Sequence, residues 1–148
     1  MHRINGTKVF LALRPKIYNV PREHVTLEFL GDNPTWDQVK LSKHDWMKQF
    51  AGLPVTVRVN GYANWVAKDE YHHVALINFH EYPELSYAKN WHITLESSRS
   101  PIEPRMFDRD VDAFNYDHAD QLWLGYTDKH GVKKFIEAHN AHHLVKEL

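Results

Sequence analysis

Two short segments of the chain carry the same reactive residue types in the same order. Residues 24–28 read His-Val-Thr-Leu-Glu and residues 92–96 read His-Ile-Thr-Leu-Glu, so the pattern recurs 68 positions further along the chain. A chain of this composition is expected to contain two His-x-Thr-Leu segments by chance about once in a thousand sequences. The repeat is therefore a signal, and it centres on two histidines and two threonines.

The alternation of polar and apolar residues in both segments predicts strands. Residues i and i+2 of a strand point to the same face, so His24 shares a face with Thr26, and His92 shares one with Thr94. Two such strands brought together would place two imidazoles and two hydroxyls around one site. This set suits a phosphodiester, because one neutral histidine acts as general base, one protonated histidine as general acid, and the hydroxyls donate to non-bridging oxygens. Imidazole has an ordinary pKa of about 6.5, which allows both forms at neutral pH. No metal ion is required, and no cofactor is expected.

The elements that position these residues follow from periodicity and from turn residues. Strands are expected over 8–13, 24–30, 53–60, 71–79 and 91–96, with Val25, Leu27 and Phe29 on the buried face of the second. Helical spacing predicts a helix over about 35–50. Candidate caps are Asn33 or Thr35 at its start and Gly52 at its end. A hairpin is expected around 128–131, between strands over 121–127 and 132–138. Loops are expected over 81–90 and 97–109, and a short helix over 139–148.

Composition bounds the class of protein. The chain has 148 residues, which suits one domain over 1–148, and it has no Cys, which excludes thiol catalysis, disulfide scaffolds and thiolate zinc sites. The net charge of −1 argues against binding to long duplex nucleic acid. The N-terminus lacks a signal-peptide pattern and no window approaches the roughly 18 apolar residues of a membrane span. We therefore expect a cytoplasmic monomer without a membrane partner.

With these segments in place, the chain resembles the 2H phosphoesterase superfamily, which includes RNA 2′,3′-cyclic phosphodiesterases once called 2′-5′ RNA ligases. Residues 8–15 look like the opening strand of that family, 24–31 and 92–95 like its two motifs, 53–62 like the strand after its first helix, and 122–136 like its closing hairpin. The resemblance implies an α+β fold of two pseudo-symmetric lobes, each an antiparallel sheet with flanking helices, and an active-site cleft between the lobes. It also implies that His24, Thr26, His92 and Thr94 are catalytic.

The chain departs from the larger members of that family. Only residues 81–90 stand where those members carry a long helix before the second motif, and Trp91 replaces their usual Pro. In this it is similar to compact, often virus-encoded members, some of which degrade cyclic oligonucleotide or 2′-5′-linked oligoadenylate signals of antiviral defence. The implied substrate is a small nucleotide or oligonucleotide, and the implied compartment is the cytoplasm, that of the host if the protein is viral. Alternatives are an RNA 2′,3′-cyclic phosphodiesterase of RNA end processing, a non-catalytic nucleotide-binding sponge, or a His-rich metal hydrolase.

Further residues are candidates for substrate binding. Phe10 would line the floor of the cleft or pack in the core. Three residues of the following loop would hold a phosphate, stack on a base or remain solvated. Two aromatic residues near a turn would stack on a base or cover the core. The candidates are Phe10, Arg14, Lys16, Tyr18, Trp65 and Tyr71.

The remaining polar and aromatic residues have plainer interpretations. Glu28 and Glu96 share the strand face of the histidines and are interpreted as rim charges that repel long RNA, and Trp91 is expected to pack. The histidines of the C-terminal tail are expected to be solvated, with a metal site as the alternative, and the three histidines at 72, 73 and 80 receive no role.

Overall fold

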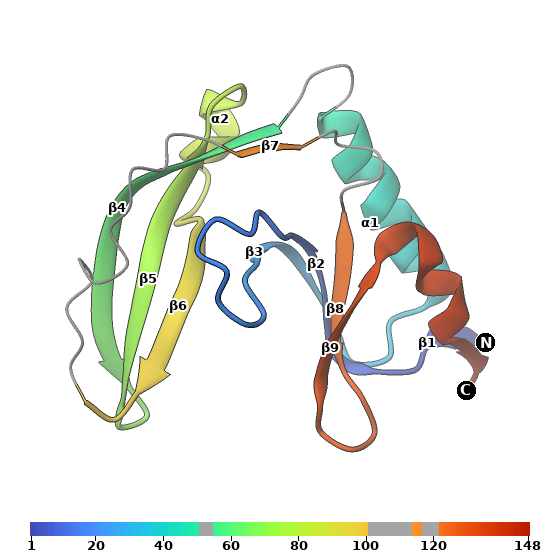
Figure 1. Ribbon diagram of the computed structural model, residues 1–148. Coiled ribbons are helices and arrows are strands. Elements are labelled where there is room, and N and C mark those ends of the chain that lie inside the picture. Colours follow the sequence, from blue (N-terminus) through green and yellow to red (C-terminus); the bar gives the residue numbers. More distant parts are fainter. Residues whose placement is uncertain (51–54, 101–113, 117–121) are drawn as a thin grey trace. The chain divides into compact units, whose positions relative to one another are not determined.

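The computed structural model describes residues 1–50, 55–100, 114–116 and 122–148. Within these residues the helices are α1 (Trp36–Gln49), α2 (Pro83–Ser86) and the 3-10 helix η3 (Ala138–Leu144). The strands are β1 (His2–Ile4), β2 (Thr7–Leu13), β3 (Val25–Gly31), β4 (Val55–Ala67), β5 (Glu70–Phe79), β6 (His92–Ser98), β7 (Phe114–Tyr116), β8 (Trp123–Thr127), β9 (Lys133–Glu137) and β10 (Val145–Glu147). Strands paired in antiparallel sheets with few helices make this an α+β protein, as predicted (Figure 1).

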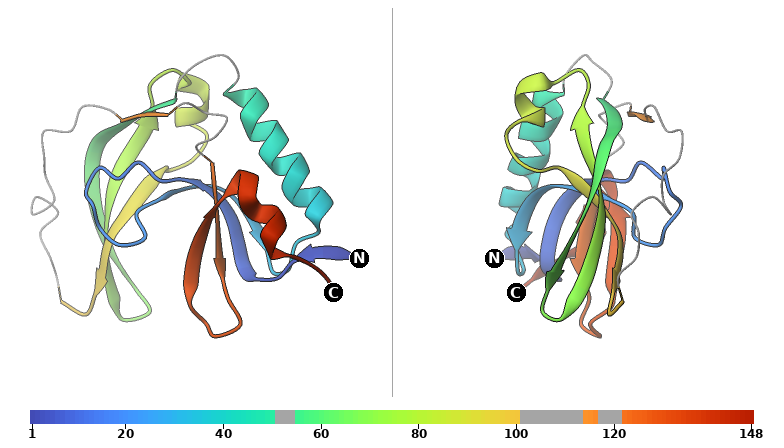
Figure 2. Two further views of the ribbon diagram at one scale, coloured as in Figure 1. Left: turned by 45° about the vertical axis from the view of Figure 1, so that its right-hand side comes forward. Right: turned by 90° about the vertical axis from the view of Figure 1, so that its left-hand side faces the viewer.

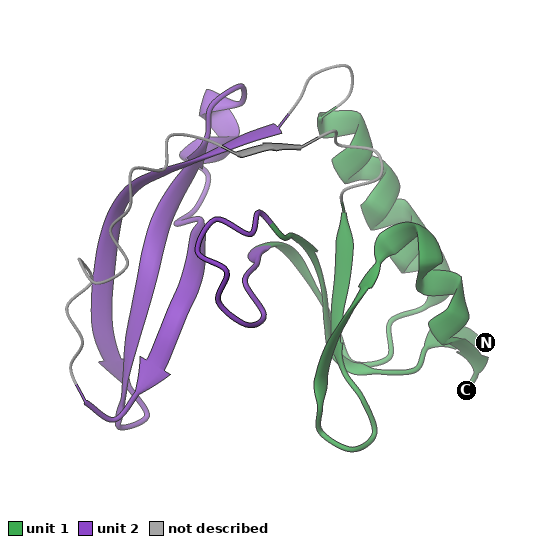
Figure 3. Ribbon diagram, viewed as in Figure 1, with its two compact units in different colours: residues 1–14, 26–53, 117–148 green, residues 15–25, 54–116 purple. Residues whose placement is uncertain are grey.

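The chain divides into two compact units (Figure 3). The first unit comprises Met1–Arg14, Thr26–Leu53 and Asp117–Leu148. The second unit comprises Pro15–Val25 and Pro54–Tyr116. The first contains a sheet of order β3-β2-β8-β9, and the second a sheet of order β6-β5-β4-β7. Both segments of the repeat thus contribute an edge strand, β3 in one sheet and β6 in the other. Strands β1 and β10 pair separately and bring the two chain ends together (Figure 2).

Local sequence explains the boundaries of α1. Thr35 is the N-cap: its backbone is extended, and its hydroxyl accepts the Gln38 N–H at 3.1 Å. Asn33, the other candidate, instead donates its side-chain amide to the Ile4 carbonyl at 3.2 Å. The helix buries Val39 and Ser42 and ends at Phe50, whereas the predicted C-cap Gly52 lies outside the described residues.

The β4–β5 hairpin sets which side chains share a face in the second unit. Lys68 and Asp69 form its turn with φ of 51° and 61°, the positive values that a tight two-residue hairpin turn requires. Trp65 consequently pairs with His72. Further along the sheet, Leu76 pairs with His92 of β6. Strand β4 has a register shift between Val59 and Gly61.

The predicted C-terminal hairpin is confirmed as β8 and β9. Its turn is closed by Asp128, whose carboxylate accepts the N–H groups of His130 and Val132, each at 2.9 Å, and by Gly131 at φ 77°. The short helix expected in the tail is confirmed in part, as the 3-10 helix η3, but the strand β10 follows it. The segment 81–90, which was expected to be a loop, contains the short helix α2. No helix in the described ranges is both long and apolar enough to cross a membrane.

Candidate functional site: two histidines with the same anchor

His24 and His92 make the same hydrogen bond. The Nδ1 atom of His24 lies 2.7 Å from the carbonyl oxygen of Arg22, and that of His92 lies 3.0 Å from the carbonyl oxygen of Asn90. A carbonyl oxygen only accepts, so Nδ1 carries the proton in both rings. Any proton exchange with a substrate must therefore use Nε2. When the ring is neutral, Nε2 is a base, and when the ring is charged, Nε2 is an acid.

A buried carboxylate organises the loop that carries His24. Glu23 is only 2% exposed, and its two oxygens accept the backbone N–H groups of Ile17 at 2.5 Å and of Tyr18 at 2.9 Å. The loop also contains three non-glycine residues with positive φ, which are Lys16, Asn19 and Arg22. Such backbone conformations persist when the surroundings impose them. Glu23 is thus the residue that holds the segment preceding His24.

The open face of the second sheet carries His92. Cross-strand register and alternation put His92, Thr94 and Ser97 of β6 on the same face as His72 of β5 and Trp65 of β4. The Trp65 ring stacks on His72 with a centroid distance of 5.5 Å and meets the His92 ring edge to face at 6.5 Å. His72 is itself fixed through Nδ1 by the Ser97 hydroxyl at 2.9 Å. With 44% of its surface exposed, Trp65 offers a flat apolar ring beside His92.

The two threonines are not equivalent. Thr94 is exposed on the same face as His92. Thr26 is half-buried, and alternation along β3 places it on the side of Glu28, whose carboxylate accepts from Ser42 at 3.1 Å and from the Trp46 indole at 2.9 Å. The interpretation of Glu28 as a rim charge was wrong, because this carboxylate ties β3 to α1. Thr94 is consequently the better placed hydroxyl for a phosphate.

In the first unit, Phe10 and Arg14 form a layer of rings and a cation. The Phe10 ring lies directly over Gly125, where an added Cβ would be 2.1 Å from it, and it packs edge to face on Phe135 at 5.9 Å. The Arg14 guanidinium lies 4.1 Å from the Phe135 ring centre and 5.1 Å from that of Trp123. Phe10 is 5% exposed, so it belongs to the core of this unit, whereas Arg14 is half-buried.

Three other predicted binding residues have separate positions. Lys16 is exposed in the loop. Tyr18 is 4% exposed, and its hydroxyl is hydrogen-bonded to that of Tyr62 at 2.8 Å, so the prediction that its ring stacks on a base was wrong. Tyr71 pairs with Val66 and therefore lies on the opposite face of the sheet from Trp65.

Trp91 packs, as expected. It is 3% exposed, its indole N–H donates to the Leu85 carbonyl at 2.8 Å, and its ring lies edge to face against Phe79 at 5.0 Å. The Lys89 ammonium lies 4.3 Å from the centre of the Trp91 ring, and burial lowers the pKa of that lysine. The residue immediately before His92 is thereby anchored in the core.

Sequence reasoning missed Glu23 and His72. His72 pairs with Trp65 because of the two-residue turn at 68–69, which the Lys-Asp sequence does not predict. Nothing in the local sequence distinguishes Glu23 from a solvated loop carboxylate. In the tail, His139 pairs with Glu137 at 3.2 Å and the rings of His142 and His143 lie 4.1 Å apart. Among the described residues, no three His, Asp or Glu side chains gather as metal ligands.

Comparison with known proteins gives no assignment. No model of a known protein family matches the sequence, and no curated protein matches it significantly.

Proposed function

We propose that this protein is a metal-independent phosphodiesterase in which His24 and His92 act as general base and general acid. The substrate we propose is a cyclic oligonucleotide or an RNA-type linkage, that is 2′-5′, 3′-5′ or 2′,3′-cyclic. The observation that carries the proposal is the shared anchor of the two rings, Nδ1 to the carbonyl oxygen two residues earlier in the chain. This anchor is repeated in the two segments that also repeat in sequence.

The surroundings of His92 support the same chemistry. A neutral ring fixed through Nδ1 presents Nε2 as the proton acceptor, and a charged ring presents N–H as the donor, so each histidine suits either role. The Thr94 hydroxyl on the same face supplies a donor to a non-bridging oxygen. The Trp65 ring supplies a stacking surface of the kind that binds nucleobases without metal ions.

Two chemical routes use these groups. With a 2′,3′-cyclic phosphate, one histidine takes a proton from water, the water oxygen bonds to phosphorus, and the second histidine protonates the ribose oxygen as its bond to phosphorus breaks. With an oligonucleotide that has a free vicinal hydroxyl, that hydroxyl replaces water and the product carries a cyclic phosphate. Both routes require one neutral and one charged histidine and therefore predict a bell-shaped pH dependence of kcat/KM.

Cleavage of a substrate panel in the presence of a chelator tests the proposal. The panel contains a nucleoside 2′,3′-cyclic phosphate, linear 2′-5′ and 3′-5′ oligoadenylates, and cyclic di- and trinucleotides. His24→Ala and His92→Ala are each expected to lower turnover by at least about 10²-fold, the lower range for loss of a general acid or base. His44→Ala removes an exposed histidine of α1 and is the matched control.

The outcomes separate the alternatives. Turnover that disappears in both variants and persists in the control supports the two-histidine mechanism, and the preferred substrate distinguishes destruction of nucleotide signals from RNA end processing. Turnover abolished by the chelator points to a metal hydrolase and overturns the proposal. Tight binding of one nucleotide without turnover means that the protein sequesters its ligand and that the repeated motif is a phosphate clamp.

A further inference from the structure

A second polar cavity lies in the first unit and shares no residue with the candidate site. It has a volume of about 400 Å³ and is lined by Asn5, Tyr126, Asp128, Lys129, His130, Lys134, His143, Leu144 and Lys146. These residues come from the β8–β9 turn, from the end of η3 with β10, and from the segment between β1 and β2. Three segments of the chain thus converge on one hollow with three lysines and two histidines.

The charges of this cavity do not balance. Asp128 is its one acidic residue among the lining side chains, and that carboxylate already accepts the His130 and Val132 N–H groups and pairs with Lys134 at 3.0 Å. Hydrogen bonds from the backbone of Val132, and then from Lys134, lower the Asp128 pKa from 3.8 to about 2. Within the part of the chain that the structure describes, Lys129 and Lys146 have no carboxylate partner. The cavity therefore retains two uncompensated ammonium groups.

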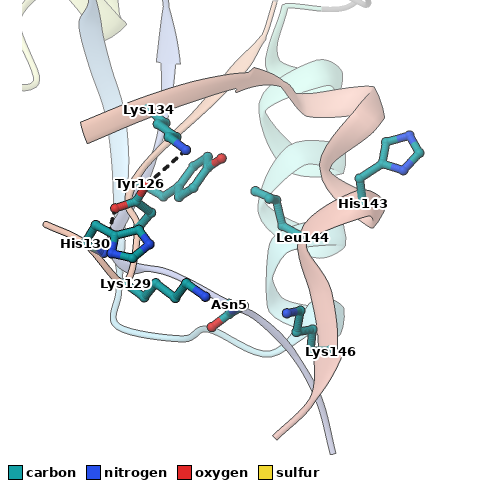
Figure 4. A pocket seen from close by; sticks show the side chains of 9 residues that line it. Asn5, Tyr126, Lys129, His130, Lys134, His143, Leu144 and Lys146 are labelled. Carbon is teal, nitrogen blue, oxygen red and sulfur yellow. Dashed lines mark hydrogen bonds and ion pairs between the residues drawn. The ribbon is translucent and has the colours of Figure 1, made fainter. Parts of the chain in front are cut away.

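The arrangement of these two lysines suits an anion. Figure 4 shows the Lys129 and Lys146 ammonium groups pointing toward Asn5 from opposite sides, while the His143 ring points away from the cavity. Asn5 is fixed by its own N–H, which donates to the Leu144 carbonyl at 2.9 Å. Next to it, an added Cβ on Gly6 would lie 3.1 Å from the Tyr126 ring, so this backbone is packed closely against the cavity wall. The floor between the lysines is thus fixed before any ligand binds.

We propose that this cavity is a binding site for a multiply charged phosphate-bearing anion, held between Lys129 and Lys146 with Asn5 at its centre. Two ammonium groups on opposite walls favour a ligand with more than one negative charge, because they can donate charge-assisted hydrogen bonds to different phosphate oxygens. A nucleotide polyphosphate and the backbone of a short oligonucleotide share this chemistry. The site does not depend on the phosphodiesterase activity proposed above, and the failure of one proposal leaves the other intact.

Calorimetric titration of the full-length protein with inorganic pyrophosphate tests this site. Saturable binding at low ionic strength is expected, and the double variant Lys129→Gln/Lys146→Gln is expected to weaken it by at least about tenfold, as suits the loss of charge-assisted hydrogen bonds. Both lysines are exposed, so the variant should remain folded. The matched control is Lys48→Gln/Lys68→Gln, which changes the net charge equally at two exposed lysines outside the cavity.

Each result decides the question. Weakening in the cavity variant with unchanged binding in the control supports the site. Equal weakening in both variants, or absence of saturable binding to the unmodified protein, overturns it. A competition experiment then compares ATP with a short single-stranded oligonucleotide. The ligand that displaces pyrophosphate at the lower concentration identifies the source of the phosphate. If neither ligand displaces pyrophosphate, the proposal is also overturned.

Discussion

The carboxylate of Glu23 is predicted to act as a positioning group for His24. Glu23 accepts two backbone N–H groups, those of Ile17 and Tyr18, with its two different oxygens. Glu23→Gln replaces one of these oxygens by an NH2 group, which cannot accept, so one of the two bonds is lost. A hydrogen bond to a charged group contributes about 1.5–3 kcal/mol. The open form of the loop should therefore become about 10- to 100-fold more populated.

Amide hydrogen exchange measures this opening directly. The amides of Ile17 and Tyr18 should exchange about 10- to 100-fold faster in Glu23→Gln, because exchange follows the population of the locally open state. An amide of the buried strand β5, such as that of Val74, reports global unfolding and should change little. The kcat/KM for the best substrate of the panel should fall by less than in His24→Ala, because the imidazole is still present but less often in place.

The control and the refuting result follow from the same contacts. Glu84→Gln changes an exposed carboxylate of α2 in the same unit and should affect neither exchange nor activity. Unchanged exchange at Ile17 and Tyr18 in Glu23→Gln would show that the carboxylate does not hold the loop. Equal acceleration at these amides and at Val74 would mean that the variant destabilises the whole unit, and the positioning role would be wrong.

Other contacts give three further predictions. Trp65→Ala should raise KM or Kd for a nucleotide substrate about 5- to 100-fold, the range for one stacked base, with little change in kcat. Val66→Ala, on the opposite face of the sheet, should leave KM and Kd unchanged, and equal effects of the two variants would contradict the assignment of Trp65. Gly125→Ala should lower the free energy of unfolding by about 1–3 kcal/mol in denaturant titration, because the new methyl group overlaps the Phe10 ring. A free energy of unfolding within error of that of the unmodified protein would be inconsistent with that packing. The folded-state pKa of Asp128 is depressed, so its contribution to stability is present above pH 3.8 and is lost as the pH falls to about 2. The stability difference between the unmodified protein and Asp128→Asn should shrink over that range, and a difference independent of pH would refute the role of the charge.

Part of the fold could be predicted from periodicity, because β6 and the start of β3 alternate between buried and more exposed residues. The strand containing His92, the helix that begins after Thr35 and the hairpin around Gly131 were all predicted from local pattern. Alternation failed near the end of β3. Phe29 was assigned to the buried face of β3, yet it is 64% exposed. Parity states which residues share a face but not whether each position of that face is covered.

The candidate site depends on details that residue types do not reveal. Trp65 and Tyr71 were paired as two rings near one turn, but the turn at Lys68 and Asp69 pairs Trp65 with His72 instead, and this offset of one residue moves Tyr71 to the other face. A positive-φ turn is expected from Asn-Gly and not from Lys-Asp, so the register was hidden from pattern reading. The hydrogen bond shared by His24 and His92 could not be predicted from residue types either. It depends on where a backbone carbonyl lies, and only the folded chain places that carbonyl beside Nδ1 in both segments.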